Sequence, residues 1–327
     1  MNTFVFALNA VLPLVLLMVL GYVVKNLKLV GPDFFNQANK LCFKIFLPTT
    51  LFLNIYKIES ISDIDLKSPL FALCAVVAAF LFGLLVTVLF VKENKQKGAV
   101  WQCVFRSNYA IMGISLAGLV YGDEGVMVAS LLSAIVIPAF NVLAVISLSV
   151  FREDGKKPSF KNVVVDICKN PLIHGVLLGV LTLLIRLIFV KTGVTFRLNG
   201  DVDFAYKTIN YVSNLTTPLA LIVLGGQFEF SSVAKAKIPI IVATVSRLVI
   251  VPSLVLLVAC GLFGFRGAPV VAFIAAFGSP VAVSSAIMAQ EMNADGELAG
   301  SLVVSTTIGS VFSLTIIIAV VKSLGLI

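Results

Sequence analysis

The run SPLFALCAVVAAFLFGLLVTVLFV, residues Ser68–Val91, contains no charged side chain. Its apolar residues follow one another without the alternation that is typical of a half-buried strand. The run also exceeds the roughly 20 residues that a helix needs to cross a bilayer. A backbone in lipid can satisfy its polar groups only in helices or in a closed barrel, so a continuous run of this length predicts a transmembrane helix.

The whole chain has this character. Of its 327 residues, 59% are hydrophobic and only 12% are charged, and the mean hydropathy is +1.08. The charged share is about half that of a soluble domain, which excludes a soluble single-core enzyme, a disordered chain and a disulfide-built secreted domain. The five cysteines are dispersed without a CxxC pair, so neither a metal site nor a disulfide framework is indicated. No Walker, GxSxG or HExxH motif is present, so we expect no enzyme and no ATP-driven pump.

Similar runs recur along the chain, and they predict an all-α polytopic membrane protein. The expected spans are Phe4–Val24, Phe34–Tyr56, Ser68–Val91, Ala99–Tyr121, Gly125–Val150, Cys168–Val190, Phe204–Phe228, Ile238–Gly261, Pro269–Gln290 and Leu298–Val321. Ten crossings leave little of the chain for a separate soluble domain. Two glycine pairs, Gly175 with Gly179 and Gly118 with Gly122, have the spacing of close helix packing.

Basic loop residues predict the orientation. If the N-terminus lies outside, the inner loops hold twelve Lys and Arg residues and the outer loops hold six. Positive charge collects in cytoplasmic loops, so we expect both termini outside and the Phe151–Ile167 loop in the cytoplasm. The net charge of +8 is thereby explained without a nucleic acid partner.

The chain also repeats itself. Leu47-Pro48-Thr49-Thr50-Leu51 in the second span matches Thr216-Thr217-Pro218-Leu219-Ala220-Leu221 in the seventh, with the two prolines 170 residues apart. Polar or helix-breaking residues interrupt the fourth and ninth spans at nearly the same offset. Residues 1–150 and 168–327 therefore form two five-span halves, joined by a linker at 151–167. An odd number of crossings inverts the second half, which is the inverted repeat of secondary transporters.

Such carriers bind their substrate at interrupted helices in matching positions of the two halves. The interrupting residues are Ser107, Asn108 and Gly113 in the fourth span, and Gly278, Ser279, Pro280 and Ser284 in the ninth. Proline and glycine free backbone groups, and two half-helix N-termini aimed at one point suit an anion. The alternative interpretation is that small and polar residues only allow close helix packing.

Two arginines and one histidine lie within the spans. Arg106 could attract a substrate carboxylate, extend toward the cytoplasmic interface, or pair with an acid. Arg247 lies near the middle of the eighth span, where no interface is near, and so has the stronger case for a buried partner. His174 is a possible proton relay, or simply a satisfied polar residue. Lys40 and Lys44 share one helix face and are expected to form a stripe facing water or the interface.

Several of these segments resemble the auxin efflux carrier family of permeases. They are Phe105-Arg106-Ser107-Asn108-Tyr109-Ala110-Ile111-Met112-Gly113, Tyr121-Gly122-Asp123-Glu124-Gly125, Leu47-Pro48, Thr217-Pro218-Leu219-Ala220-Leu221, Ala276–Ala289 and Ser305-Thr306. The resemblance covers essentially the whole chain. It implies a secondary carrier of organic anions, such as malate or malonate, with a fold like that of the bile acid–sodium symporters. Spans one, two, six and seven would be a scaffold domain, and spans three to five and eight to ten a transport domain that moves like an elevator.

By the same resemblance, helices four and nine are broken and cross. Asn108 would be the crossover residue of the first half, and Gly278, Ser279 and Pro280 its counterpart. One departure stands out: Gly113-Ile114-Ser115 occurs where bacterial members usually have Gly-x-Pro. The short central loop fits a bacterial organic acid permease of the cytoplasmic (inner) membrane better than a plant exporter.

The predicted function is therefore a secondary active transporter of a small mono- or dicarboxylate. The expected substrate-binding residues are Arg106, Ser107, Asn108, Gly113, Gly278, Ser279, Pro280 and Ser284. No cofactor or metal is expected, although H⁺ or Na⁺ would be a coupling ion, and a homodimer through the scaffold helices is a further expectation. The alternatives are a sodium-coupled symporter of another solute class and a membrane sensor that binds a ligand without turnover.

Overall fold

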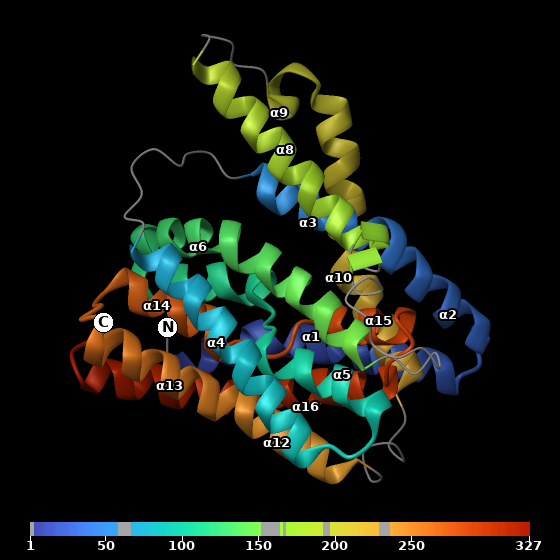
Figure 1. Cartoon of the computed structure of the whole chain (residues 1–327). Helices are drawn as coiled ribbons and strands as arrows, with labels where there is room; N and C mark the ends of the chain where they lie inside the picture. Colours follow the sequence, from blue (N-terminus) through green and yellow to red (C-terminus); the bar gives the residue numbers. More distant parts are fainter. Residues whose placement is uncertain (1–2, 58–66, 152–163, 166–167, 192–196, 229–235) are drawn as a thin grey trace.

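A computed structural model describes the chain except residues 1–2, 58–66, 152–163, 166–167, 192–196 and 229–235 (Figure 1). Its named elements are all helices, and the described residues add one isolated β-bridge. The predicted all-α class is confirmed for this part of the chain. Most of the predicted cytoplasmic loop, Phe151–Ile167, lies outside the described residues.

The helices follow the expected spans in order. In the first half they are α1 (Thr3–Asn26), α2 (Pro32–Leu41), η1 (Cys42–Phe46), α3 (Leu47–Tyr56), α4 (Lys67–Phe90), α5 (Asn94–Phe105), η2 (Tyr109–Gly113) and α6 (Ile114–Val150). In the second they are α8 (Pro171–Lys191), α9 (Leu198–Asp201), α10 (Asp203–Gln227), α12 (Lys237–Val245), η3 (Ser246–Ile250), α13 (Val251–Leu257), η4 (Val258–Leu262), α14 (Ala268–Gly278), α15 (Ser284–Glu291) and α16 (Gly296–Ser323).

Four of these stretches are long and apolar enough to cross a membrane in one piece. They are α4, α6, the continuous stretch Lys237–Leu262, and α16. The helices of the other expected spans do not combine this length with this hydropathy over the residues described. The count of ten crossings and the inverted repeat remain predictions.

Helix interruptions coincide with the residues that the sequence singled out. In the fourth span, α5 ends at Phe105 and η2 begins at Tyr109; in the ninth, α14 ends at Gly278 and α15 begins at Ser284. Two π-turns precede prolines, because a proline cannot donate the hydrogen bond that an α-helix needs there. The π-turn η1 precedes Pro48, and η3 precedes Pro252.

Glycines mark close helix contacts, with one exception to the prediction. Gly175 lies against the backbone of Pro48, and Gly179 lies against the side chain of Ile55, so α8 packs closely on α3. Gly122 instead has φ 62°, which favours glycine, and it turns the chain between the fourth and fifth spans. The interpretation of Gly122 as a helix-packing residue was therefore wrong.

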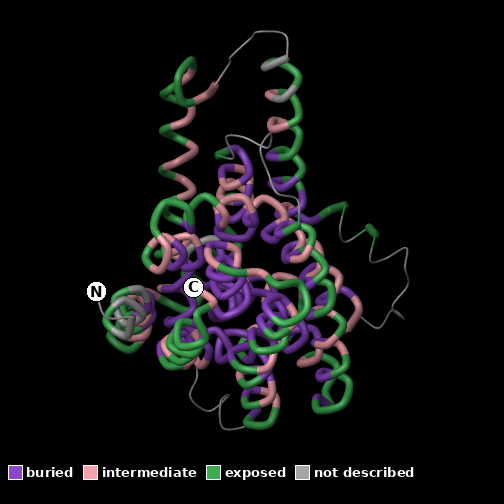
Figure 2. Tube along the Cα trace, turned by 90° about the vertical axis from the view of Figure 1, so that its left-hand side faces the viewer, coloured by how far each residue is buried: buried purple, intermediate pink, exposed green. Residues whose placement is uncertain are grey.

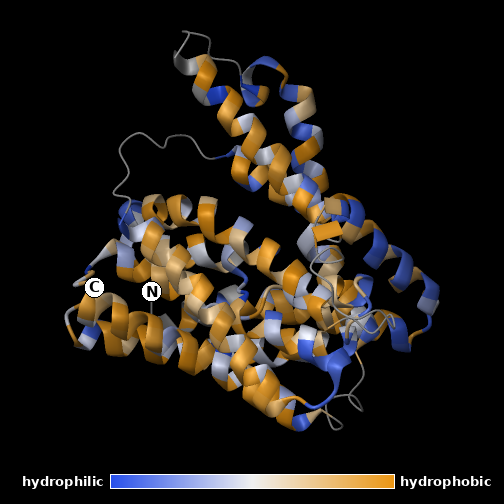
Figure 3. Ribbon diagram, in the orientation of Figure 1, coloured by the Kyte–Doolittle hydropathy of each residue, from blue (hydrophilic) through white to orange (hydrophobic). Residues whose placement is uncertain are grey.

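Burial is concentrated at the middle of a helical block (Figure 2), and most residues of α5 and α14 are buried. The helix α8 and part of α10 project from this block (Figure 1). The surface of α8 is largely apolar (Figure 3), with exposed side chains such as Leu177, Leu181 and Ile188. A soluble monomer rarely exposes so much apolar surface, whereas lipid would cover it.

Loops that were predicted to share one side of the membrane lie together. The Asp295 N–H donates to the Lys95 carbonyl at 3.1 Å, and Lys25 Nζ donates to the Phe228 carbonyl at 3.3 Å. We call this region the basic end; it is the hydrophilic region near α2 and α15 in Figure 3. The start of α1 and the C-terminus both lie away from that end (Figure 1).

Candidate functional site

The two broken helices meet through their extended segments. Ser107 and Val281 form the isolated antiparallel bridge, and the Asn108 N–H donates to the Pro280 carbonyl at 2.8 Å. The segment of the ninth span thus supplies a hydrogen-bond partner for a backbone N–H that the break in the fourth span would leave unpaired. This pairing explains how the fourth span opens although no proline lies between Phe105 and Gly113.

Helix direction gives the crossing two different faces. The half-helices α5 and α14 end at the crossing, so their C-termini and free carbonyls lie there. The half-helices that start with η2 and α15 begin at it, so their N-termini lie there. C-termini carry partial negative charge and N-termini partial positive charge.

Arg247 caps the C-terminal face. Its side chain is fully buried, with Nη1 donating to the Phe105 carbonyl at 2.9 Å and Nη2 to the Ala276 carbonyl at 3.1 Å. Nε and Nη2 also donate to the Ser279 carbonyl, at 3.1 and 3.0 Å. The expected buried partner exists, but it is a set of main-chain carbonyls from two helix ends rather than an acid.

A small pocket of about 80 Å³ lies on the N-terminal face. It is bounded by the second, fourth, fifth, seventh and ninth expected spans. Its polar lining consists of Thr50, Asn54, Arg106, Ser107, Asn108, Asn141, Thr216, Thr217 and Ser284. Four of the predicted site residues are among these: Arg106, Ser107, Asn108 and Ser284.

Arg106 is the one charged residue in that lining, and it is only 3% exposed. Its Nη2 donates to Asn141 Oδ1 at 2.7 Å and to Ser284 Oγ at 2.8 Å. Its Nη1 contacts Ser285 Oγ at 3.4 Å and the Met288 sulfur at 2.7 Å. All of these partners are neutral, and no described acid pairs with this arginine. Arg106 therefore does not extend to the surface and does not pair with a described acid. Its positive charge lies at the pocket without a negative partner among the described residues.

Two further pocket residues have unused hydrogen-bonding groups. Ser107 Oγ is buried without a partner, and the Asn108 side chain makes no hydrogen bond to any described residue. Buried polar groups are normally paired, so an unpaired hydroxyl beside a cavity indicates a partner that comes from outside the chain.

The matching proline motifs meet at the same pocket. Thr50 Oγ1 and Thr216 Oγ1 lie 2.7 Å apart, and Thr50 also donates to the Phe46 carbonyl at 2.9 Å. Sequence reasoning quoted both motifs but missed these threonines as site residues, and it missed Asn54 and Asn141 altogether. The available signal was the position of each threonine beside the proline of its half.

The other predicted residues do not line the pocket. Gly113 lies under the ring of Tyr109, where a larger side chain would clash. Gly278 packs near Leu314, while the Ser279 and Pro280 carbonyls hold Arg247 and Asn108.

Lys40, Lys44 and the lone histidine, His174, lie at the surface. His174 Nε2 lies 2.7 Å from the Cys168 carbonyl, and Lys40 and Lys44 are exposed, as expected.

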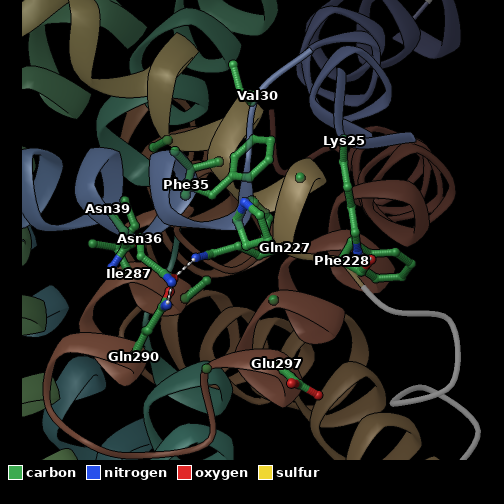
Figure 4. Close-up of a pocket in the computed structure, with 18 of the residues that line it drawn as sticks. Lys25, Val30, Phe35, Asn36, Asn39, Gln227, Phe228, Ile287, Gln290 and Glu297 are labelled. Carbon is green, nitrogen blue, oxygen red and sulfur yellow. Dashed lines mark hydrogen bonds between the residues drawn. The ribbon is translucent and has the colours of Figure 1, made fainter. Parts of the chain in front are cut away.

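A larger cavity of about 1120 Å³ opens at the basic end (Figure 4). Lys25, Lys28, Lys95 and Glu297 contribute charge to its lining. Ala220 lines both cavities, so they adjoin.

Side chains bridge α2 to α10 and α15 in this cavity. Asn36 Oδ1 accepts from Gln227 Nε2 at 3.1 Å and from Gln290 Nε2 at 3.3 Å, as Figure 4 shows. Beside them, Asn39 Nδ2 donates to Glu291 Oε1 at 2.8 Å. We call the two hydrogen bonds of Asn36, to Gln227 and Gln290, the Asn36 bridge.

A multi-pass helical protein with two paired helix breaks and a polar pocket at their crossing has the architecture of a membrane carrier. The model of the membrane transport protein family matches residues 6–318. The chain therefore belongs to this family, the auxin efflux carrier family, which is a family of transporters and not of enzymes.

Curated relatives agree with this assignment. An uncharacterized transporter of Methanocaldococcus jannaschii is 27% identical over 75% of this chain and 77% of its own length. An uncharacterized transporter of Methanothermobacter thermautotrophicus is 23% identical over 94% of this chain and 95% of its own. The uncharacterized transporter YfdV of Escherichia coli is 25% identical, with coverage of 77% and 78%.

Proposed function

We propose that this transporter is a secondary active carrier of a small organic anion, a mono- or dicarboxylate such as malate or malonate. The observation that carries the proposal is Arg106, a buried cation at a pocket with neutral partners only. Burying an unpaired charge is costly, and an incoming carboxylate would compensate it through charge-assisted hydrogen bonds. Asn141 and Ser284 hold the guanidinium at the pocket wall.

The surroundings of Arg106 fit the same substrate class. The pocket lies at the N-termini of two half-helices, where the positive ends of the helix dipoles favour negative charge. Ser107 and Asn108 offer donors without partners in the described structure. A pocket of about 80 Å³ suits a molecule of a few heavy atoms and is too small for a steroid-like solute.

For the mechanism, we propose an inverted repeat that moves as an elevator. Helix α1 packs on α10, and α8 packs on α3. In both contacts, the first span of one half packs on the second span of the other half. A two-fold relation between the halves would produce this pair of contacts. Glycines allow both contacts: Gly21 and Gly225 in the first pair, Gly175 and Gly179 in the second. Such contacts suit a scaffold against which the other spans move.

We further propose that the basic end faces the cytoplasm of a bacterial cell, because positive charge is retained on that side. In that orientation the 1120 Å³ cavity is an inward vestibule that leads to the 80 Å³ pocket.

Uptake into proteoliposomes tests the function. Purified protein is reconstituted, and radiolabelled malate, malonate and smaller monocarboxylates are offered with and without a Na⁺ gradient or a pH gradient. We expect saturable uptake of at least one acid, with counterflow, and loss of uptake in Arg106→Gln but not in the exposed control Arg266→Gln. Strict Na⁺ dependence with a neutral solute would favour the symporter alternative. Binding without counterflow would favour a sensor and refute the carrier.

A further inference from the structure

Arg247 binds the crossing of the two broken helices and does not line the pocket. It lies on η3 in the eighth expected span, has 0% exposure, and does not line the 80 Å³ pocket. Its described hydrogen bonds all go to carbonyl oxygens, which belong to Phe105, Ala276 and Ser279. One guanidinium therefore joins the C-terminus of α5 to the C-terminus of α14.

Those carbonyls form an environment for a cation. The last carbonyls of a helix have no intrahelical partner and carry the negative end of the helix dipole. Two such ends meet within reach of one side chain, inside a membrane protein where water cannot easily compensate them. In secondary transporters, half-helix C-termini and unwound carbonyls of this kind coordinate the coupling cation.

We propose that the crossing contains a cation-binding site that Arg247 fills as a tethered cation. The site consists of the Phe105, Ala276 and Ser279 carbonyls, and its natural ligand is the guanidinium of the chain itself. Removing that side chain leaves a site that a free guanidinium ion occupies. This role is independent of which substrate the pocket binds and of whether the protein transports.

The π-turn supports this assignment, because it places the arginine there. A π-turn inserts one residue into the helical turn and is often found at functional sites. The η3 turn, Ser246–Ile250, comes just before Pro252, and Arg247 is its second residue. The irregular backbone is thus located where the two helix ends need a positive charge.

Rescue by a free cation tests the proposal. Arg247→Ala protein is purified in detergent, and its thermal unfolding is followed with low-millimolar guanidinium chloride, well below denaturing concentrations. Urea, the neutral molecule of the same shape, and choline chloride at equal ionic strength are the controls. We expect the Tm of Arg247→Ala to lie well below that of the parent, and to rise saturably with guanidinium but not with urea or choline. The Tm of the parent should not respond.

Two further variants decide the outcome even if Arg247→Ala does not fold. Arg247→Lys keeps the charge, and Arg247→Met keeps the bulk without it. We expect the lysine variant to have the higher membrane yield and the higher Tm. The exposed Arg266, which donates to the Cys260 and Phe265 carbonyls, is the matched control: Arg266→Ala should show no guanidinium response.

The proposal is overturned if Arg247→Met equals or exceeds Arg247→Lys, or if urea stabilises Arg247→Ala as well as guanidinium does. It is also overturned if a folded Arg247→Ala responds to neither. Since the readout is thermal stability without substrate, a failure of the transport assay leaves this test unaffected. Conversely, a failed rescue would not count against an organic anion as substrate.

Discussion

Replacing Arg106 with glutamine should weaken substrate binding while leaving the stability of the folded protein nearly unchanged. The change removes the positive charge from the pocket and leaves a shorter, neutral amide in place of the guanidinium that contacts Asn141 and Ser284. If a substrate carboxylate pairs with this buried guanidinium, losing one partner of the pair costs about 2–5 kcal/mol. At about 1.4 kcal/mol per factor of ten, KM should rise by about 30-fold to several thousand-fold.

The folded state should lose little from the same change. Arg106 has no acidic partner among the described residues, so its desolvation is not offset by an ion pair. Removing the charge relieves that penalty while weakening several neutral hydrogen bonds. We expect the free energy of unfolding to change by less than about 1 kcal/mol. Arg247→Ala should behave in the opposite way, because its charge is held by two helix ends.

The assay pairs two measurements on the same preparation. Proteoliposome uptake of the best labelled acid gives KM for the parent, Arg106→Gln and Arg106→Lys, and detergent thermal unfolding gives their Tm values. Arg106→Lys keeps the charge but loses the planar fork, so its KM should be intermediate. An Arg106→Gln variant with parental KM would refute the role assigned to this arginine. So would a loss of uptake that is matched by a large fall in Tm.

Other predictions concern the pocket, the Asn36 bridge, the packing of α10 on α1 and the orientation in the membrane. Ser107→Ala should raise KM by about 3- to 10-fold without lowering the Tm, because its buried hydroxyl has no partner to lose; a fall in Tm with unchanged uptake would contradict this. Joining Asn36→Cys to Gln290→Cys with a short bifunctional reagent should block uptake reversibly if the Asn36 bridge opens during transport, whereas either single variant should keep uptake. Gly225→Leu should lower the yield of folded protein, because an added side chain would meet the backbone of α1, at a cost of about 1–3 kcal/mol or more; parental stability would refute the close contact. A cysteine in place of Lys157 should resist a membrane-impermeant reagent added outside intact cells, and labelling would reverse the orientation.

The Asn36 bridge suggests where the moving parts separate. Its three side chains come from α2, α10 and α15, and the first two belong to the proposed scaffold while the third belongs to the proposed transport domain. Hydrogen bonds between neutral side chains are each worth about 1 kcal/mol, so they can open on a transport timescale. The hydrogen bond between Thr50 and Thr216 lies wholly within the proposed scaffold and need not break.

Local sequence was sufficient for the elements and their interruptions. Long apolar runs predicted the helices, and polar or helix-breaking residues near Ser107 and Ser279 predicted the two breaks. These features depend on the chain's immediate chemistry: hydrocarbon demands internally bonded backbone, and proline or a polar insertion disrupts it. The family followed from the same short segments.

Only the tertiary structure decided what each broken end faces. In the sequence, Arg106 and Arg247 are both cations inside apolar spans, yet one lies at a pocket on helix N-termini and the other caps helix C-termini. Sequence reasoning also grouped Ser279 with Ser107, although Ser279 gives its carbonyl to Arg247 and Ser107 keeps an unpaired hydroxyl at the pocket. These differences arise from pairing between segments more than 100 residues apart, as in the Ser107–Val281 bridge. Hydropathy and spacing describe a residue's neighbours in sequence, whereas the direction in which a helix enters a crossing, and hence the sign of its dipole there, is set only when the two halves pack.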